Sequence, residues 1–164
     1  RQMLINAEYI RGEEDIANNI DDTKRILPYI EKAEREWIIN AIGVKNYKDL
    51  EKGTDDAVLN LLLEGGYYKE DTIFFSGLRK AIAHLAYSLF VRNDNVFSTS
   101  SGFRYKGNTE LSDRIEDKTI LRVANEAEAR GLKYLNECIS YLKIAQGNTA
   151  VFKVTKKKFI IIGN

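Results

Sequence analysis

The sequence DKTILRVANEAEARGLKYLNECISYLKI, residues 117–144, predicts the longest helix of the chain. Its apolar and small residues recur in steps of three and four, which places them on one stripe of a helix. A glycine within a helix costs about 1 kcal/mol relative to alanine, so Gly131 indicates that another backbone comes close there. The stripe consists of Ile120, Ala124, Ala127, Gly131, Leu135, Cys138 and Leu142, widened by Val123, Leu132 and Ile139.

A second stretch, residues 73–92, has the same character and predicts the partner of this helix. Small residues again recur at helical spacing, and bulky apolar residues flank them. Two helices with small seams can pack closely while the bulky flanks fill the grooves on either side. The small positions are Gly77, Ala81, His84 and Ser88, and the flanks are Phe74, Leu78, Ile82, Leu85 and Leu89.

Shorter helices precede this pair. Residues 28–42 predict a helix that starts at Pro28, with its inward face at Ile30, Ala33, Trp37, Ile38 and Ala41. A short helix is expected at 45–51, with Tyr47 and Leu50 facing inward, and another after Thr54 as N-cap. The predicted fold is mainly α, a bundle of about four to five helices built on two long packed helices.

The expected organisation has three parts. Residues 1–22 predict an N-terminal arm, either partly ordered or packed on its own or a neighbouring subunit, because Leu4, Ile5, Tyr9 and Ile10 need cover. The helical bundle spans 23–146 and contains a long loop at 93–116, in which 103–106 alternates aromatic and basic residues as a short strand would. Residues 147–164 predict a C-terminal β-strand pair around Lys156 to Lys158.

Composition excludes several classes of protein. The 164 residues suffice for one well-buried core, and 25 Lys plus Arg against 24 Asp plus Glu gives a net charge of +1, which argues against general polyanion binding. One cysteine excludes an internal disulfide and fits a reducing compartment. No apolar run approaches the roughly 20 residues that cross a bilayer. The first residues lack the features of a signal peptide, so we expect a protein made in the cytoplasm.

Few residues suggest chemistry. The lone histidine, His84, lies on a predicted buried stripe, where a hydrogen-bonded core or interface role is expected, and Cys138 is expected to act as a small hydrophobe. A His84–Cys138 dyad is conceivable but lacks a visible orienting carboxylate. The sequence contains no calcium loop or phosphate-binding glycine loop, so we predict a non-enzyme with no catalytic, cofactor-binding or metal-ligating residue.

The succession of elements resembles a known family. LINAEYI near the start is followed by LPYIEKAEREWIINAIG and VKNYKDL, then a long helix, a glycine-containing loop and the helix AEARGLKYLNECISYL. The run from Ile30 to Leu50 is the most characteristic. This order resembles the head–tail connector (adaptor) proteins of tailed bacteriophages and prophages, particularly those of phages that infect gut Bacteroidetes.

The resemblance implies a structural virion protein. It would form a ring of typically twelve copies below the portal, continue the DNA channel and dock the tail or the next ring, in the neck of a virion assembled in the host cytoplasm. Its partners would be itself, the portal protein and the tail, with DNA passing without sequence-specific binding and no membrane contact. The interface candidates are Leu4, Ile5, Tyr9, Phe103, Arg104, Tyr105, Lys106, Phe152, Val154, Phe159 and Ile161.

Two other classes stay open. A non-enzymatic helical binding module, such as a nucleic-acid-binding packaging or regulatory factor, would need Arg104, Lys106 and the lysines at 156–158 to gather on one basic face. An enzyme with an unrecognised site would need a cleft that joins His84 to other polar groups.

Overall fold

The computed structural model describes residues 2–93, 97–99, 102–104 and 110–147, with side chains in 2–93 and 118–147. The fold is mainly helical, as predicted, and carries two small antiparallel hairpins. The elements are α1 (Ala7–Glu13), a π-helical turn (Asp22–Ile26), α2 (Leu27–Ala33), a second π-helical turn (Glu34–Ile38), α3 (Ile39–Ile42), α4 (Val44–Lys52), α5 (Ala57–Glu64), β1 (Gly66–Tyr68), β2 (Ile73–Phe75), α6 (Leu78–Asn93), β3 (Phe97–Thr99), β4 (Gly102–Arg104) and α7 (Glu110–Gln146).

Helices α6 and α7 form the frame, as the sequence predicts. They run antiparallel, because Arg92 near the end of α6 bonds Glu128, whereas His84, two turns earlier, lies against Tyr134. At the crossing, a Cβ added to Gly131 would lie 2.7 Å from Leu85 Cγ and 3.0 Å from the Leu85 backbone nitrogen. The close backbone approach expected at Gly131 is therefore confirmed.

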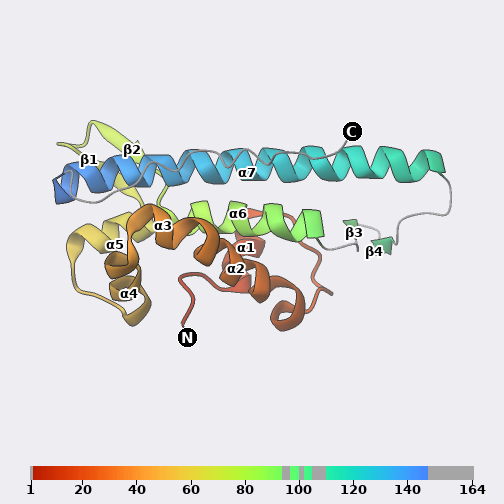
Figure 1. Cartoon of the computed structure of the whole chain (residues 1–164), viewed down its shortest axis with the longest axis horizontal. Coiled ribbons are helices and arrows are strands. Elements are labelled where there is room, and N and C mark those ends of the chain that lie inside the picture. The colour runs from red at the N-terminus through yellow and green to blue at the C-terminus, as the bar shows by residue number, and fades with distance from the viewer. Residues whose placement is uncertain (1, 94–96, 100–101, 105–109, 148–164) are drawn as a thin grey trace.

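Helix α6 lies at the centre of the bundle. Figure 1 shows α7 along one side of it and α1 and α2 on the other. A helix that is covered on all sides is apolar all round rather than on one stripe. Accordingly, most of its residues are buried, including Leu78, 81–86 and 88–91.

The N-terminal region belongs to the same core. Asn6 caps α1 by accepting a 2.8 Å hydrogen bond from the Tyr9 backbone, and Leu4, Ile5 and Ile10 are buried in the chain itself. Ile16 and Ile20 are also buried, although the segment that carries them is not helical. Of the alternatives for the arm, packing on its own subunit is the one the structure shows, so the boundary expected at residue 22 does not separate it from the bundle.

Two helices begin at a different residue from the one expected. The helical run that ends at Ile42 starts at Asp22, where Asp21 caps it by accepting from the Lys24 backbone at 2.8 Å, and it passes Pro28 after one π-helical turn. Helix α5 is capped by Asp56, which accepts from Val58 at 2.9 Å, rather than by Thr54. For α5, aspartate is at least as good an N-cap as threonine, so the sequence offered two caps two residues apart.

The helix expected from residue 73 begins at Leu78. Residues Ile73 to Phe75 instead form β2, which pairs antiparallel with β1. Isoleucine and phenylalanine favour strands, and Gly77 has φ +94, which a right-handed helix does not contain. Gly77 therefore lies outside the small seam, whereas Ala81, His84 and Ser88 are buried as predicted.

The loop expected at 93–116 contains structure. The strands β3 and β4 pair antiparallel, and α7 begins at Glu110 rather than Asp117. Leu111 and Ile115 are one helical turn apart, and Glu110 and Asp113 put acidic residues in the first turn, which the helix dipole favours. The predicted C-terminal strand pair lies outside the described residues.

Candidate functional site

The β1–β2 hairpin is held rigidly on the bundle by its base. A Cβ added to Gly65 would lie 2.5 Å from the Ser76 carbonyl carbon, and one added to Gly77 would lie 2.5 Å from the Gly65 nitrogen. Both glycines have positive φ, +76 and +94. The two ends of the hairpin therefore cross backbone to backbone, which only glycine permits at both positions.

The inner face of the hairpin is closed by an aromatic cluster. Tyr68 and Phe75 lie against Tyr141 of α7, with ring centroids 5.1 and 4.7 Å apart, and Phe75 is buried. The Tyr141 hydroxyl donates to the Val58 carbonyl at 2.9 Å, which ties α5 to the same cluster. Burial, with a smaller effect from Asp56, raises the pKa of Tyr141, so its hydroxyl remains a donor.

The outer face of the hairpin is open. Tyr67 and Phe74 lie opposite each other in the register, with ring centroids 5.1 Å apart, and are 60% and 57% exposed. Successive side chains of a strand point to opposite faces, so closing the inner face leaves these rings outward. A rigid hairpin thus presents a paired aromatic surface to solvent.

Other exposed apolar side chains gather at the same end of the molecule. Val44 and Ile144 are each 56% exposed, and both lie two residues from the pair Asn46–Gln146, whose side-chain amides exchange two 3.1 Å hydrogen bonds. Among the described side chains, the large apolar residues exposed in this way are Val44, Tyr67, Phe74, Ile144 and Leu121, and only Leu121 belongs to the other end of α7. We call Val44, Tyr67, Phe74 and Ile144 the exposed apolar end.

The interface candidates from the sequence that the structure describes lie outside the exposed apolar end. Leu4 and Ile5 are buried in the core, so the chain covers them without a neighbouring subunit, and Tyr9 is half-buried beside them. Phe103 and Arg104 lie in β4, which agrees with the strand expected there. The candidates outside the described residues are Tyr105, Lys106, Phe152, Val154, Phe159 and Ile161.

His84 takes part in a cluster of polar side chains that the sequence did not reveal. Its Nδ1 lies 2.5 Å from Oε1 of Glu14, and the Arg130 guanidinium lies 3.2 Å from the same oxygen. Glu14 is the C-cap of α1, so the cluster joins α1, α6 and α7. Glu14 supplies next to His84 the carboxylate that no sequence pattern indicated. Because Arg130 contacts the same carboxylate, this group primarily holds three helices together.

A second buried carboxylate, Glu34, lies in the second π-helical turn. It is fully buried and accepts hydrogen bonds from the Leu4 backbone at 2.7 Å and from the Tyr47 hydroxyl at 3.0 Å. Buried carboxylates are rare unless they are partnered in this way. Glu34 therefore fixes the N-terminal segment on the bundle, and neither its burial nor its partners could be read from local spacing.

Cys138 lies in an environment that does not suit a catalytic nucleophile. It is fully buried on the inner stripe of α7, as predicted, and burial raises the pKa of its thiol far above the ordinary value. A nucleophilic cysteine needs the opposite shift, toward the thiolate. In the described region no hydrogen bond or ion pair links it to His84, which contacts Glu14 and packs against the Tyr134 ring.

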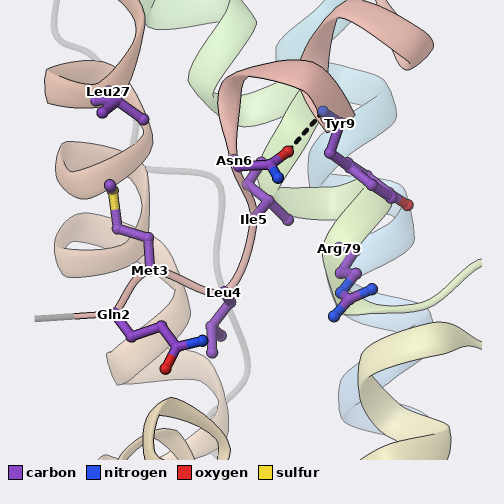
Figure 2. Close-up of a pocket in the computed structure, with 8 residues that line it drawn as sticks. All are labelled: Gln2, Met3, Leu4, Ile5, Asn6, Tyr9, Leu27 and Arg79. Carbon is purple, nitrogen blue, oxygen red and sulfur yellow. Dashed lines mark hydrogen bonds between the residues drawn. The ribbon is translucent and has the colours of Figure 1, made fainter. Parts of the chain in front are cut away.

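A cavity of about 430 Å³ lies beside the N-terminal segment (Figure 2). Nη1 of Arg79 pairs with Glu64 at 2.7 Å, and its buried Nε has no hydrogen-bond acceptor among the described residues. The described lining residues bring together no pair of acid and base that could act on a substrate. They are Gln2, Met3, Leu4, Ile5, Asn6, Tyr9, Leu27 and Arg79.

Two kinds of site are absent from the described part of the chain. Within it, no three His, Cys, Asp or Glu side chains come together as a metal ion would require. None of the helices found there has the length and apolarity needed to cross a membrane.

Comparison with known proteins gives a family but no function. A family model described as a family of unknown function, DUF6712, matches residues 38–150, which is more than half of the chain. No curated protein and no solved structure matches. The matched region includes the hairpin, the α6–α7 crossing and the exposed apolar end, whereas Glu14 and Glu34 precede it.

Proposed function

We propose that this chain, which belongs to the DUF6712 family, is a structural subunit of a phage neck: a head–tail connector that forms a ring below the portal. The proposal joins two independent lines of support. One is the sequence resemblance carried by the run from Ile30 to Leu50 and by the order of the helices. The other is the exposed apolar end.

The exposed apolar end is the observation that carries the proposal. Single apolar residues on a surface need no explanation, but several at one place favour a protein–protein contact. Four of the five strongly exposed large apolar side chains of the described region belong to elements at one end of the bundle. The hairpin that carries two of them is fixed by Gly65 and Gly77, so a partner would meet a preformed surface.

The internal polar groups also favour a structural role. Glu14 and Glu34 tie the N-terminal region to α6, α7 and Tyr47, so these carboxylates serve packing within the subunit. A connector transmits load between a head and a tail and needs a subunit of fixed shape. The net charge of +1 suits a channel through which DNA slides without binding tightly.

The test is the mass of the purified protein in solution, across concentration, by native mass spectrometry, first alone and then with the portal protein. We expect a closed ring of about twelve copies, alone or on the portal. A chain that stays monomeric with the portal present would refute the connector role. Salt-sensitive binding of DNA by that monomer would then establish the alternative, a nucleic-acid-binding module.

A further inference from the structure

We propose that the hairpin β1–β2 is the acceptor for the C-terminal segment, residues 148–164, of a neighbouring copy of this chain. The segment would lie beside the hairpin as an added strand and cover Tyr67 and Phe74. This inference rests on the proposed assembly of the chain into a ring and names the surfaces that would join two of its subunits.

The acceptor has the form that strand addition requires. The hairpin is a sheet of two strands, and no third strand pairs with either of its edges among the described residues. A two-stranded sheet of three-residue strands is marginal in water without additional cover. The inner face has that cover from Tyr141, whereas the outer face leaves two aromatic rings exposed, and an added strand could pair with an edge that no described strand occupies.

The donor begins beside the acceptor. Helix α7 ends at Gln146, and Gly147, with φ +70, turns the chain away from the helix axis. Figure 1 shows that this end of α7 is the one on which the hairpin lies. The segment that follows therefore starts next to the exposed apolar end of its own subunit, close to where a neighbour that docks on this end would be.

The sequence of the donor matches the acceptor. Phe152 and Val154 alternate with Lys153 and Thr155, and Phe159 and Ile161 recur at the same spacing of two, so an extended chain would carry apolar residues on one face. Such a face suits Tyr67 and Phe74, since aromatic cross-strand pairs stabilise a sheet.

The charges of donor and acceptor are also complementary. Lys156, Lys157 and Lys158 lie between the two apolar parts of the segment. The exposed tip of the hairpin carries Glu70 and Asp71 beside Lys69, and so has an acidic excess. Burial, with a smaller effect from the nearby Glu137, raises the pKa of Tyr68. Complementary charge of this kind fixes the orientation and register of a docked strand.

The proposed ring indicates that the added strand comes from a neighbouring copy and not from the same chain. A segment that folded back on its own hairpin would join no subunits. A ring needs each subunit to offer one surface to the next copy and a different surface to the previous one. The C-terminal segment and the hairpin are two such unlike surfaces, so we assign the segment of one copy to the hairpin of the next.

A complementation experiment with full-length chains tests the assignment. The acceptor variant is Tyr67→Ser with Phe74→Ser, and the donor variant is Phe152→Asp with Phe159→Asp. Each variant alone should lose the self-association of the unmodified chain. An equimolar mixture should form a one-to-one complex, because the intact segment of the acceptor variant can dock on the intact hairpin of the donor variant. The complex should stop at two chains, since the remaining donor and acceptor are both defective.

The control and the contrary results are defined by the same mass measurement. Leu121→Ser removes an exposed apolar side chain at the other end of α7 and should assemble as the unmodified chain does. Circular dichroism should show unchanged helicity in all variants. A mixture that stays monomeric would overturn the assignment in favour of docking within one chain, and so would an acceptor variant that assembles normally. A two-chain complex without any ring on the portal would instead uphold the docking and refute the connector role.

Discussion

The α6–α7 crossing and the β1–β2 hairpin both contain a close backbone approach, but the side chains around it are covered differently. Each depends on glycine at a close approach: Gly131 against Leu85 in the crossing, and Gly65 against Gly77 at the base of the hairpin. At the crossing, the flanking side chains are buried on every side. On the hairpin, Phe75 of the inner face is buried and Tyr68 is partly buried, whereas the two rings of the outer face are more than half exposed.

The difference shows what a close backbone contact can and cannot reveal. In both places glycine fixes the geometry, so neither region owes its shape to a partner. Only the exposure of Tyr67 and Phe74 distinguishes the hairpin as a surface for contact with another molecule. A close backbone contact shows where the structure is fixed. Apolar side chains that are exposed on such a fixed region mark a candidate site for contact with another molecule.

The largest expected effect is the difference in the free energy of unfolding between substitutions on the two faces of the hairpin. Phe75→Ala removes a ring that is 1% exposed and stacks on Tyr141, so it should lower the free energy of unfolding by about 3–5 kcal/mol. The matched change Phe74→Ala, on the outer face, should cost about 0.5 kcal/mol or less. Urea denaturation of both variants measures the difference, and equal losses would show that the outer ring is also part of the core.

The next effect tests the crossing. Gly131→Leu should lower the free energy of unfolding by about 2 kcal/mol, because the new side chain overlaps Leu85 and its backbone nitrogen. Gly12→Leu is the matched control, since Gly12 also lies in a helix but a Cβ there meets nothing within 4 Å. A melting temperature that Gly131→Leu leaves unchanged would mean that α6 and α7 do not approach closely.

A smaller effect tests the internal anchoring of the N-terminal region. Tyr47→Phe removes the hydroxyl that donates to Glu34 at 3.0 Å and should cost about 1 kcal/mol. The ring stays buried in the core, so the loss reports the hydrogen bond. Thermal unfolding of this variant beside the unmodified chain gives the value, and a gain in stability would show that Glu34 does not need this donor.

The smallest effect concerns alkaline pH. Burial, with smaller effects from Glu14 and Asp15, raises the pKa of Tyr87 to about 12. A phenol whose pKa is higher in the folded state stabilises that state below its unfolded pKa of about 10, and the contribution is lost as the pH rises toward 12. Tyr87→Phe should therefore lose less stability than the unmodified chain between about pH 10 and 12.

Urea denaturation at several pH values between those limits makes the comparison. Identical slopes for Tyr87→Phe and the unmodified chain would contradict the burial of this hydroxyl as a source of alkaline instability.

The sequence predicts what depends on local periodicity. The inward residues Ile30, Ala33 and Trp37 and the close approach at Gly131 were all correct, because helical spacing alone places them. It missed β2 because Ile73 to Phe75 join an apolar run that continues into α6 without a break in helical spacing. It missed the contact between Glu14 and His84 because these residues are 70 positions apart, and no local pattern relates them.

The exposed apolar end could not be predicted from the sequence, for a related reason. Tyr67 and Phe74 have the same residue types as Tyr68 and Phe75, and only the three-dimensional position of Tyr141 decides which pair is covered. Strand alternation predicts that the two pairs face opposite ways, but not which way is inward. Leu4 and Ile5, expected in an arm that packs on its own or a neighbouring subunit, are buried in the core of their own chain.

The length of α7 has a mechanical consequence. Its 37 residues, at about 1.5 Å each, form a single rod of about 55 Å. The hairpin is fixed near one end of this rod, and the other end projects past α6 (Figure 1). Two molecules bound at the two ends of α7 would therefore be held at a separation that the length of this helix fixes.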